Sequence, residues 1–300
     1  MNIQTLLIII ILIHAFWLQP TYASTPQELF EEGSRLADQN KHQEAIKLYK
    51  KALEYKIDSN YHKAVLYYNI GLSYSKLGDT KKSISSYTNC LQYYPNYTLA
   101  YLNRGNDNLN EERVEEAIND FSDAIALDSK LFFAYNSRAI AYIKSNEFEK
   151  SILDLNYAIQ LNPKYLNAYK NRARVYSQTN KFQLALVDIE KAINLGTKDA
   201  WFYNLAAWTY ATYPDASVRN AARAVTLAQK AVKLSEDSRS LDTLAAAYAE
   251  QGSFDLALRT QKLAIEMLPD DSNKELRIRL KNRYKTYKNG KPWRDKESLN

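Results

Sequence analysis

The sequence predicts an all-α protein, a solenoid of about seven helix-turn-helix units closed by a C-terminal capping helix. Three observations carry this prediction: few helix breakers, a repeat of 34 residues, and small residues at fixed places in each repeat. With only 7 Gly and 7 Pro in 300 residues, the chain lacks the turns of an all-β sandwich and the glycines of a phosphate loop. At 46% hydrophobic and 25% charged residues, the composition excludes global disorder.

Residues 1–23 are predicted to be an export signal. Residues 6–18 form an almost uninterrupted apolar core, and Thr21 and Ala23 place small residues three before and one before the predicted cut. A helix of this core spans about 20 Å, less than the bilayer interior of about 30 Å, so a permanent membrane span is disfavoured. No Lys or Arg precedes the core, which fits an export signal poorly. We expect an exported, periplasmic or secreted chain, with a membrane anchor formed by the uncleaved leader as the alternative.

The strongest signal is internal repetition with a period of 34 residues. Units begin near residues 26, 64, 98, 132, 166, 199 and 238 and together span 26–271. Positions 8, 20 and 27 of every unit hold only Gly, Ala, Ser or Cys. Position 8 is Gly33, Gly71, Gly105, Ala139, Ala173, Ala206 and Ala245; position 20 is Ala45, Ser83, Ala117, Ser151, Ala185, Ala224 and Ala257; position 27 is Ala52, Cys90, Ala124, Ala158, Ala192, Ala231 and Ala264. These types make up about a quarter of average usage, so 21 matches do not arise by chance.

Each unit contains two amphipathic stretches separated by a polar turn. The small side chains let the two helices of a hairpin, and the next hairpin, approach closely, while large residues at positions 4 and 24 fill the remaining space. Position 4 holds Tyr67, Tyr101, Tyr135, Tyr169 and Phe202, and position 24 holds Tyr49, Tyr87, Phe121, Leu155 and Ile189. One hairpin cannot bury its apolar face alone, so the hairpins must stack into a solenoid with an extended binding surface.

The register resembles that of the tetratricopeptide repeat family over residues 26–271. The resemblance implies a right-handed superhelix of about seven units with a concave groove that binds segments of other proteins. This chain departs from the family pattern at four extra residues within 57–62, at about five within 213–219, and at Asn108, where Tyr is usual. Three segments, 204–215, 241–248 and 287–294, are similar to a C-terminal module common in bacterial repeat proteins, which favours an exported protein of bacterial type.

Asn recurs at position 6 of the first helix of the unit. The column consists of Asn69, Asn103, Asn171 and Asn204, with Ser137 in the fourth unit. Asn costs about half a kcal/mol against Ala inside a helix, so its recurrence on one face needs a reason. The resemblance places this face in the concave groove, where an amide offers both a donor and an acceptor to a peptide backbone. The alternative is exposed Asn inherited as the units duplicated, and the sequence leaves both open.

A second column pairs Arg at position 7 with Asp at position 23, and only three units have both residues. Pairing within one unit uses all six charges, whereas pairing each Arg with the Asp of the preceding unit leaves Arg104 and Asp188 alone. The predicted structural ion pairs between the two helices of one hairpin are Arg104–Asp120, Arg138–Asp154 and Arg172–Asp188.

Residues 272–300 are predicted to form a capping helix and a basic tail. Helical spacing is kept by Leu276, Leu280, Tyr284 and Tyr287. Residues 274–300 contain ten basic and three acidic side chains, which give this segment a net charge of +7. Because the whole chain has a net charge of +6, the remaining residues together carry −1. A terminal unit of a solenoid needs a polar cover. A solvated cap is therefore one interpretation, and a weak, salt-dependent contact with anionic lipid or an acidic protein is the other.

The residues that catalysis, cofactors or metals require are scarce. The single cysteine, Cys90, falls in the small-residue column at position 27 and is predicted to be a buried packing residue. His42 and His62 lie far apart in the register without another ligand at metal spacing. The chain also lacks a Gly-rich phosphate loop and a serine nucleophile elbow. We expect no catalytic residue, no cofactor and no metal.

These features predict a non-catalytic scaffold or adaptor that binds a peptide segment or a partner protein in its groove, in the cell envelope. A helical-repeat protein that binds nucleic acid is the alternative that the basic tail raises. The near-neutral body disfavours it, because tracking phosphates needs basic residues along the repeats, so no nucleic-acid partner is expected. A small hydrolase is the third and least favoured hypothesis.

Overall fold

The computed structural model describes residues 25–268 and 274–295, so the predicted export signal at residues 1–23 lies outside the described residues. Within these ranges the chain forms fifteen α-helices, α2 to α16, and no β-strand, which confirms the predicted all-α class. The chain divides into two compact bodies, Met1–Asp128 and Ser129–Asn300. No helix in the described part of the chain is both long and apolar enough to cross a membrane.

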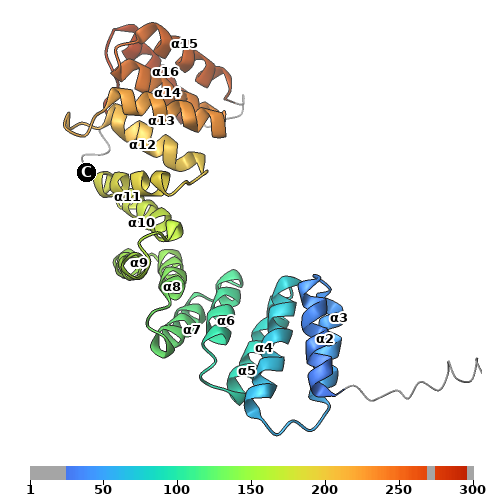
Figure 1. Ribbon diagram of the computed structural model, residues 1–300. Coiled ribbons are helices and arrows are strands. Elements are labelled where there is room, and N and C mark those ends of the chain that lie inside the picture. The colour runs from blue at the N-terminus through green and yellow to red at the C-terminus, as the bar shows by residue number, and fades with distance from the viewer. Residues whose placement is uncertain (1–24, 269–273, 296–300) are drawn as a thin grey trace, which may run out of the picture. The chain divides into compact units, whose positions relative to one another are not determined.

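The N-terminal body consists of three helical hairpins. Its helices are α2 (Pro26–Asp38), α3 (His42–Leu53), α4 (Asn60–Lys76), α5 (Thr80–Tyr93), α6 (Thr98–Asn110) and α7 (Val114–Leu127). The second helix of one hairpin packs on the first helix of the next, α3 on α4 and α5 on α6, as the blue to green part of Figure 1 shows. This stacking is the arrangement that the 34-residue period requires.

The C-terminal body contains four hairpins and one further helix. Its helices are α8 (Phe132–Lys144), α9 (Phe148–Leu161), α10 (Leu166–Gln178), α11 (Phe182–Asn194), α12 (Ala200–Thr212), α13 (Ala221–Leu234), α14 (Ser238–Glu250), α15 (Phe254–Glu266) and α16 (Lys274–Lys288). The same stacking recurs from α9 to α10, from α11 to α12 and from α13 to α14 (Figure 1). Successive first helices therefore lie along one side of this body.

The three columns of small residues line the interfaces between helices. All 21 of these residues are buried, and the Ala, Ser and Cys side chains among them are at most 1% exposed. In the first five hairpins, position 8 is Gly where position 24 is aromatic and Ala where position 24 is Leu or Ile. A Cβ atom on Gly105 would lie 2.7 Å from Cε1 of Phe121, well inside the carbon contact distance of about 3.5 Å. The spacing of the two helices thus depends on the pair of residues at positions 8 and 24.

The turn inside six of the hairpins needs a left-handed backbone at position 15. The residues there are Asn40, Gly78, Glu112, Asn146, Asn180 and Gly252, with φ between 57° and 83°. Gly and Asn adopt this conformation readily, whereas a long side chain such as that of Glu112 is strained in it. The sixth hairpin has a different turn because residues 213–219 lengthen it.

The four extra residues before the second repeat lengthen a helix. Helix α4 begins at Asn60, behind the N-cap residue Ser59, whose side chain accepts a hydrogen bond from the backbone N–H of His62. It has 17 residues, whereas α2 and α6 have 13 each. The extra turn of helix starts within the segment 57–62 that breaks the register in the sequence.

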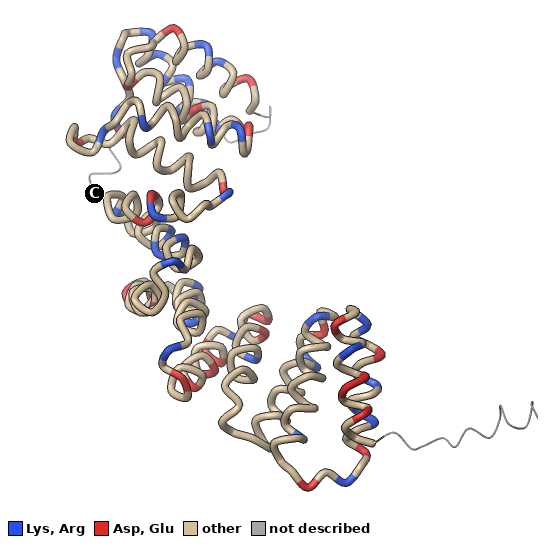
Figure 2. The backbone as a smooth tube through the Cα atoms, viewed as in Figure 1, with Lys and Arg blue, Asp and Glu red and all other residues tan. Residues whose placement is uncertain are grey.

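Helix α16 covers the last hairpin by packing on α15. Leu280 and Tyr287 are buried, and Leu276 and Tyr284 are half-buried, as their helical spacing predicts. Seven Lys or Arg side chains and one Glu are distributed along α16 (Figure 2). The helix therefore has an apolar side toward α15 and a strongly basic remainder.

Candidate functional site

The asparagines of position 6 have different partners in the structure. Asn69 donates to a backbone carbonyl of its own helix at 2.8 Å. Asn103 donates to the hydroxyl of Tyr68 at 3.1 Å, and Asn171 donates to the side-chain oxygen of Asn136 at 2.9 Å. These last two bonds join the first helices of neighbouring hairpins. Three of the four amide nitrogens are thus engaged by the scaffold itself.

Asn204, on α12, differs from the other members of the column. Its amide oxygen is buried and accepts no hydrogen bond from any residue that the structure describes. The side chain forms part of the wall of two adjoining cavities. A buried acceptor left without a donor costs about 1–3 kcal/mol, so this oxygen is poised to accept a hydrogen bond from a ligand.

The two cavities at Asn204 together form what we call the C-terminal groove. The first, about 260 Å³, lies between α12, α14 and α16 and is lined by Trp201, Asn204, Leu205, Trp208, Arg239, Asp242, Thr243, Leu276, Arg279 and Arg283. The second, also about 260 Å³, shares Trp201, Asn204 and Arg239 and extends to Asp199 and Asp237. Both apolar and charged side chains therefore line the groove.

A buried polar centre supports one wall of the groove. Arg283 forms an ion pair with Asp242, and Gln261 donates to the other carboxylate oxygen at 2.8 Å. The Arg283 guanidinium lies 4.5 Å from the ring centre of Trp208 and 5.5 Å from that of Trp293. Burial raises the pKa of the Asp242 carboxyl, and the nearby Arg283 acts in the opposite direction. The centre fixes α14 and α16 relative to each other and so sets the width of the groove.

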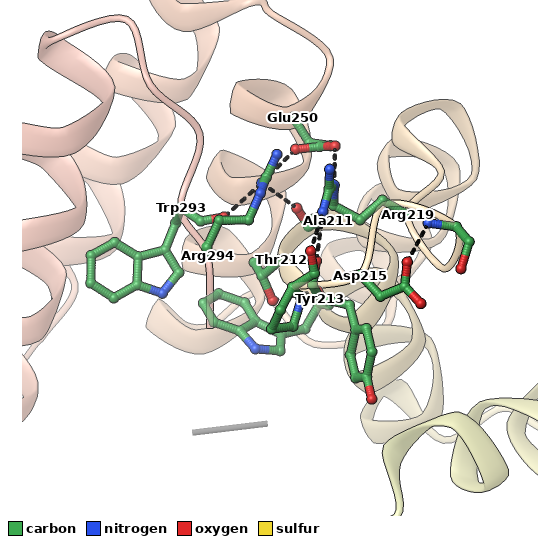
Figure 3. A network of polar contacts seen from close by, with 11 residues as sticks. Ala211, Thr212, Tyr213, Asp215, Arg219, Glu250, Trp293 and Arg294 are labelled. Carbon is green, nitrogen blue, oxygen red and sulfur yellow. Dashed lines mark hydrogen bonds and ion pairs between the residues drawn. The ribbon is translucent and has the colours of Figure 1, made fainter. Parts of the chain in front are cut away.

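The segment after α16 joins a network of polar contacts with the sixth and seventh hairpins (Figure 3). Glu250 receives two guanidinium groups, Arg219 at 3.0 Å and Arg294 at 2.6 Å. Arg219 also donates to two carbonyl oxygens of the long turn in the sixth hairpin, which secures the inserted residues 213–219. The indole N–H of Trp208, in the groove wall, donates to Asp295 at 2.8 Å. The C-terminal segment thus contacts the groove wall at Trp208.

The three Arg–Asp pairs expected within hairpins are present as ion pairs. The distances are 2.6 Å for Arg104–Asp120, 2.8 Å for Arg138–Asp154 and 2.7 Å for Arg172–Asp188. Each guanidinium also lies over the ring of the tyrosine three residues before it. Asn108 adds a hydrogen bond to Asp120, and burial raises the pKa of that carboxyl. Because the guanidinium groups are held on several sides, their role is architectural.

Arg104 and Arg172 also reach the preceding hairpin. Arg104 donates to the hydroxyl of Thr88 at 3.1 Å, and Arg172 donates to the amide oxygen of Asn156 at 2.5 Å. Thr88 lies on α5 and Asn156 on α9, each the second helix of the hairpin before. Each of these arginines therefore ties three helices together.

A larger cavity, of about 770 Å³, lies in the N-terminal body between α2, the α3–α4 connection and α4. Phe30, Ile57, Val65 and Leu66 give it a largely apolar lining. Among the described residues, no side chain of this lining has a buried polar atom without a hydrogen-bond partner. The C-terminal groove, which has such an atom, is therefore the stronger candidate site.

The structure shows no group of three or more His, Cys, Asp or Glu placed to hold a metal within residues 25–268 and 274–295. His42 begins α3 and His62 lies in the first turn of α4. Cys90 is fully buried, which confirms the packing role predicted for it, and burial raises the pKa of its thiol to about 12. A thiol of this kind stays protonated at neutral pH and is a poor nucleophile.

Sequence reasoning missed Arg239, Asp242, Arg279 and Arg283 as site residues. Helix α16 lies outside the 34-residue register, so its arginines belong to no column that could be compared between repeats. The available signal was the spacing of Arg279 and Arg283, four residues apart and therefore on one side of a helix. Which side that is depends on how α16 packs.

Comparisons with known proteins agree with this architecture. Residues 64–97 match the sequence profile of the tetratricopeptide repeat. A tetratricopeptide repeat protein from Parabacteroides merdae aligns with a TM-score of 0.57 at 19% identity, over 88% of this chain and 98% of that one. YrrB, described as a tetratricopeptide repeat protein with an unusual peptide-binding site, aligns with a TM-score of 0.58 at 16% identity, over 66% and 99%. MamA aligns with a TM-score of 0.51 at 23% identity, over 54% and 93%. A comparison with curated protein sequences finds no match.

Proposed function

We propose that this chain is a non-catalytic scaffold of the tetratricopeptide repeat kind, which binds a segment of another protein in the C-terminal groove. The observation that carries the proposal is the buried amide oxygen of Asn204, which accepts no hydrogen bond from the described residues. Trp201 and Leu205 line the groove beside it. A backbone N–H of an extended segment would satisfy the oxygen while an apolar side chain of that segment covered the wall.

The likeness in fold to YrrB, which is described as having a peptide-binding site, supports this class of function. We assign ligand contact to Asn204 and not to the whole column of asparagines. Asn103 and Asn171 bond neighbouring first helices, so their replacement is expected to act on stability. The column therefore has two roles, with the ligand role at its last member.

The test compares Asn204→Ala with Asn171→Ala in the full chain. Peptides selected on the wild-type protein from an array are labelled, and their Kd values are measured by fluorescence anisotropy. We expect Asn204→Ala to weaken binding by about three- to tenfold, the value of one hydrogen bond, without lowering the melting temperature.

Asn171→Ala is the matched control, because it removes the same amide from the scaffold bond to Asn136. It is expected to lower the melting temperature and leave the Kd unchanged. Equal Kd values for Asn204→Ala and the wild type, or loss of binding in the control alone, would contradict the assignment.

We also propose that the protein is exported to the cell envelope. The support is the apolar core of residues 6–18 followed by the cleavage motif that ends at Ala23, which lies outside the described residues. Mass spectrometry of fractionated cells is expected to show a mature N-terminus at Ser24 in the envelope or the medium. An intact chain in the membrane fraction would indicate the anchored alternative, and an intact cytosolic chain would contradict export.

A further inference from the structure

Two arginines line the C-terminal groove and have no carboxylate partner among the residues that the structure describes. Arg239 is the second residue of α14, and Arg279 lies on α16. Both are exposed, both line the cavity that contains Asn204, and neither forms an ion pair within the described part of the chain. The charge of Arg279 favours the ionised form of Asp242, but Asp242 forms its ion pair with Arg283. The groove therefore presents two guanidinium groups to solvent.

The carboxylates of the groove are already engaged. Asp242 is paired with Arg283, and Asp199 is paired with two basic side chains at 3.1 and 3.6 Å. Asp237 caps α14 by accepting a hydrogen bond at 2.8 Å from the backbone of that helix. Among the described residues, neither Arg239 nor Arg279 is paired with a carboxylate, so a ligand can neutralise their charge.

The remaining lining restricts the ligand further. Trp201, Leu205 and Leu276 contribute apolar surface to the cavity that the two arginines and Asn204 also line. Guanidinium groups bind carboxylates in a planar, bidentate manner, and a half-buried indole offers a flat surface to an apolar or aromatic side chain. The matching ligand carries carboxylates next to an apolar side chain on an extended backbone.

We propose that the C-terminal groove selects an internal acidic segment of the partner protein, with its carboxylate side chains on Arg239 and Arg279. This inference rests on the proposed function and names the chemistry of the partner at the same site. Because Arg279 belongs to α16, the basic capping helix completes the groove.

The experiment uses the full chain and an array of short amidated peptides in which acidic, basic and neutral sequences are equally represented. We expect the bound peptides to combine Asp or Glu with Leu, Phe or Trp. The double variant Arg239→Glu/Arg279→Glu should raise the Kd of these peptides at least about tenfold. Binding should also weaken as salt rises, because exposed charge pairs are screened.

The matched control is Lys281→Glu/Lys285→Glu. It changes the net charge by the same amount on exposed residues of α16 that do not line the cavity. The control should keep the wild-type Kd within about twofold, and circular dichroism melting should show that both double variants are folded. If the charge reversal unfolds the protein, Arg239→Gln/Arg279→Gln replaces it with the same expected loss of acidic peptides.

Each other outcome overturns the inference. Equal losses in the two double variants would show general attraction to the basic helix. Binding of the same peptides with a free C-terminal carboxylate, but not of their amidated forms, would exclude an internal segment. Neutral or basic peptides whose binding still depends on Asn204 would refute the acidic partner and leave the proposed function intact. Failure to bind any peptide would contradict both the acidic partner and the proposed peptide-binding function. If single-stranded RNA binds tightly and Arg239→Glu/Arg279→Glu abolishes that binding, the groove binds nucleic acid instead.

Discussion

The substitutions Gly105→Ala and Phe121→Leu, made singly and together, test whether the residues at positions 8 and 24 set the distance between the two helices of a hairpin. A Cβ atom on Gly105 would lie 2.7 Å from Cε1 and 2.9 Å from Cδ1 of Phe121. Phe121 is fully buried, so its ring has little space to yield. The next hairpin has Ala139 and Leu155 at the same two positions, and both are fully buried there. The double variant Gly105→Ala/Phe121→Leu therefore gives the third hairpin the same residues at positions 8 and 24 as the fourth hairpin.

We expect Gly105→Ala to lower the free energy of unfolding when residue 121 is Phe and to raise it when residue 121 is Leu. Alone, the change gains up to about 1 kcal/mol of helix propensity and loses about 1–3 kcal/mol by overpacking, a net loss of up to about 2 kcal/mol. In the background of Phe121→Leu the ring is gone, so the same change stabilises the protein by up to about 1 kcal/mol. The coupling free energy between the two sites is thus about 1–3 kcal/mol.

Urea unfolding followed by circular dichroism measures the free energy of unfolding of the wild type, the two single variants and the double variant. Ala139→Gly is the control, because Leu155 leaves room for a Cβ atom there, and it should cost about 1 kcal/mol of helix propensity. A coupling below about 0.5 kcal/mol in the double-mutant cycle would refute the reasoning, because sites without contact are additive at that level.

Three further variants test other features of the scaffold. Glu112→Gly should raise the free energy of unfolding by about 1 kcal/mol in urea, because Glu112 has a φ of 61°; no gain would contradict the strain. Arg172→Ala leaves Asp188 buried without its partner and should cost about 3–5 kcal/mol in thermal unfolding, more than the joint removal of both residues. Burial raises the pKa of Asp107 above 3.8, so the folded state holds this proton more tightly and stability falls as pH rises from that value. Asp107→Asn should flatten this part of the stability curve, and an unchanged slope would exclude Asp107 as its source.

The hairpins could be predicted because their signal is local and periodic. A small residue such as Ala117 or Ala192 is needed wherever two helices touch, and the same contact recurs every 34 residues. The Arg–Asp columns are equally periodic, since both partners belong to one hairpin of fixed geometry. The left-handed turn position was not predicted, because its occupants include Asn, Gly and Glu and share no property that the sequence makes visible.

The column of asparagines shows where periodicity stops being informative. Asn103 and Asn171 bond Tyr68 and Asn136, which stand at position 5 of the preceding unit and differ from one repeat to the next. Four identical residues in one column therefore have different hydrogen-bond partners. What each amide does is decided by the side chain that the neighbouring hairpin presents to it.

By itself the sequence determined the helices, their pairing into hairpins and the ion pairs inside them, because each of these depends on residues less than one repeat apart. Only the tertiary structure decided which side of α16 faces α12 and α14, and hence that Arg279 meets Trp201 and Asn204 in one groove. The same holds for the unpaired oxygen of Asn204, because burial without a donor is a property of everything packed around an atom. Stacking brings segments that are distant in sequence together, and the 34-residue repeat does not predict which of their residues come into contact.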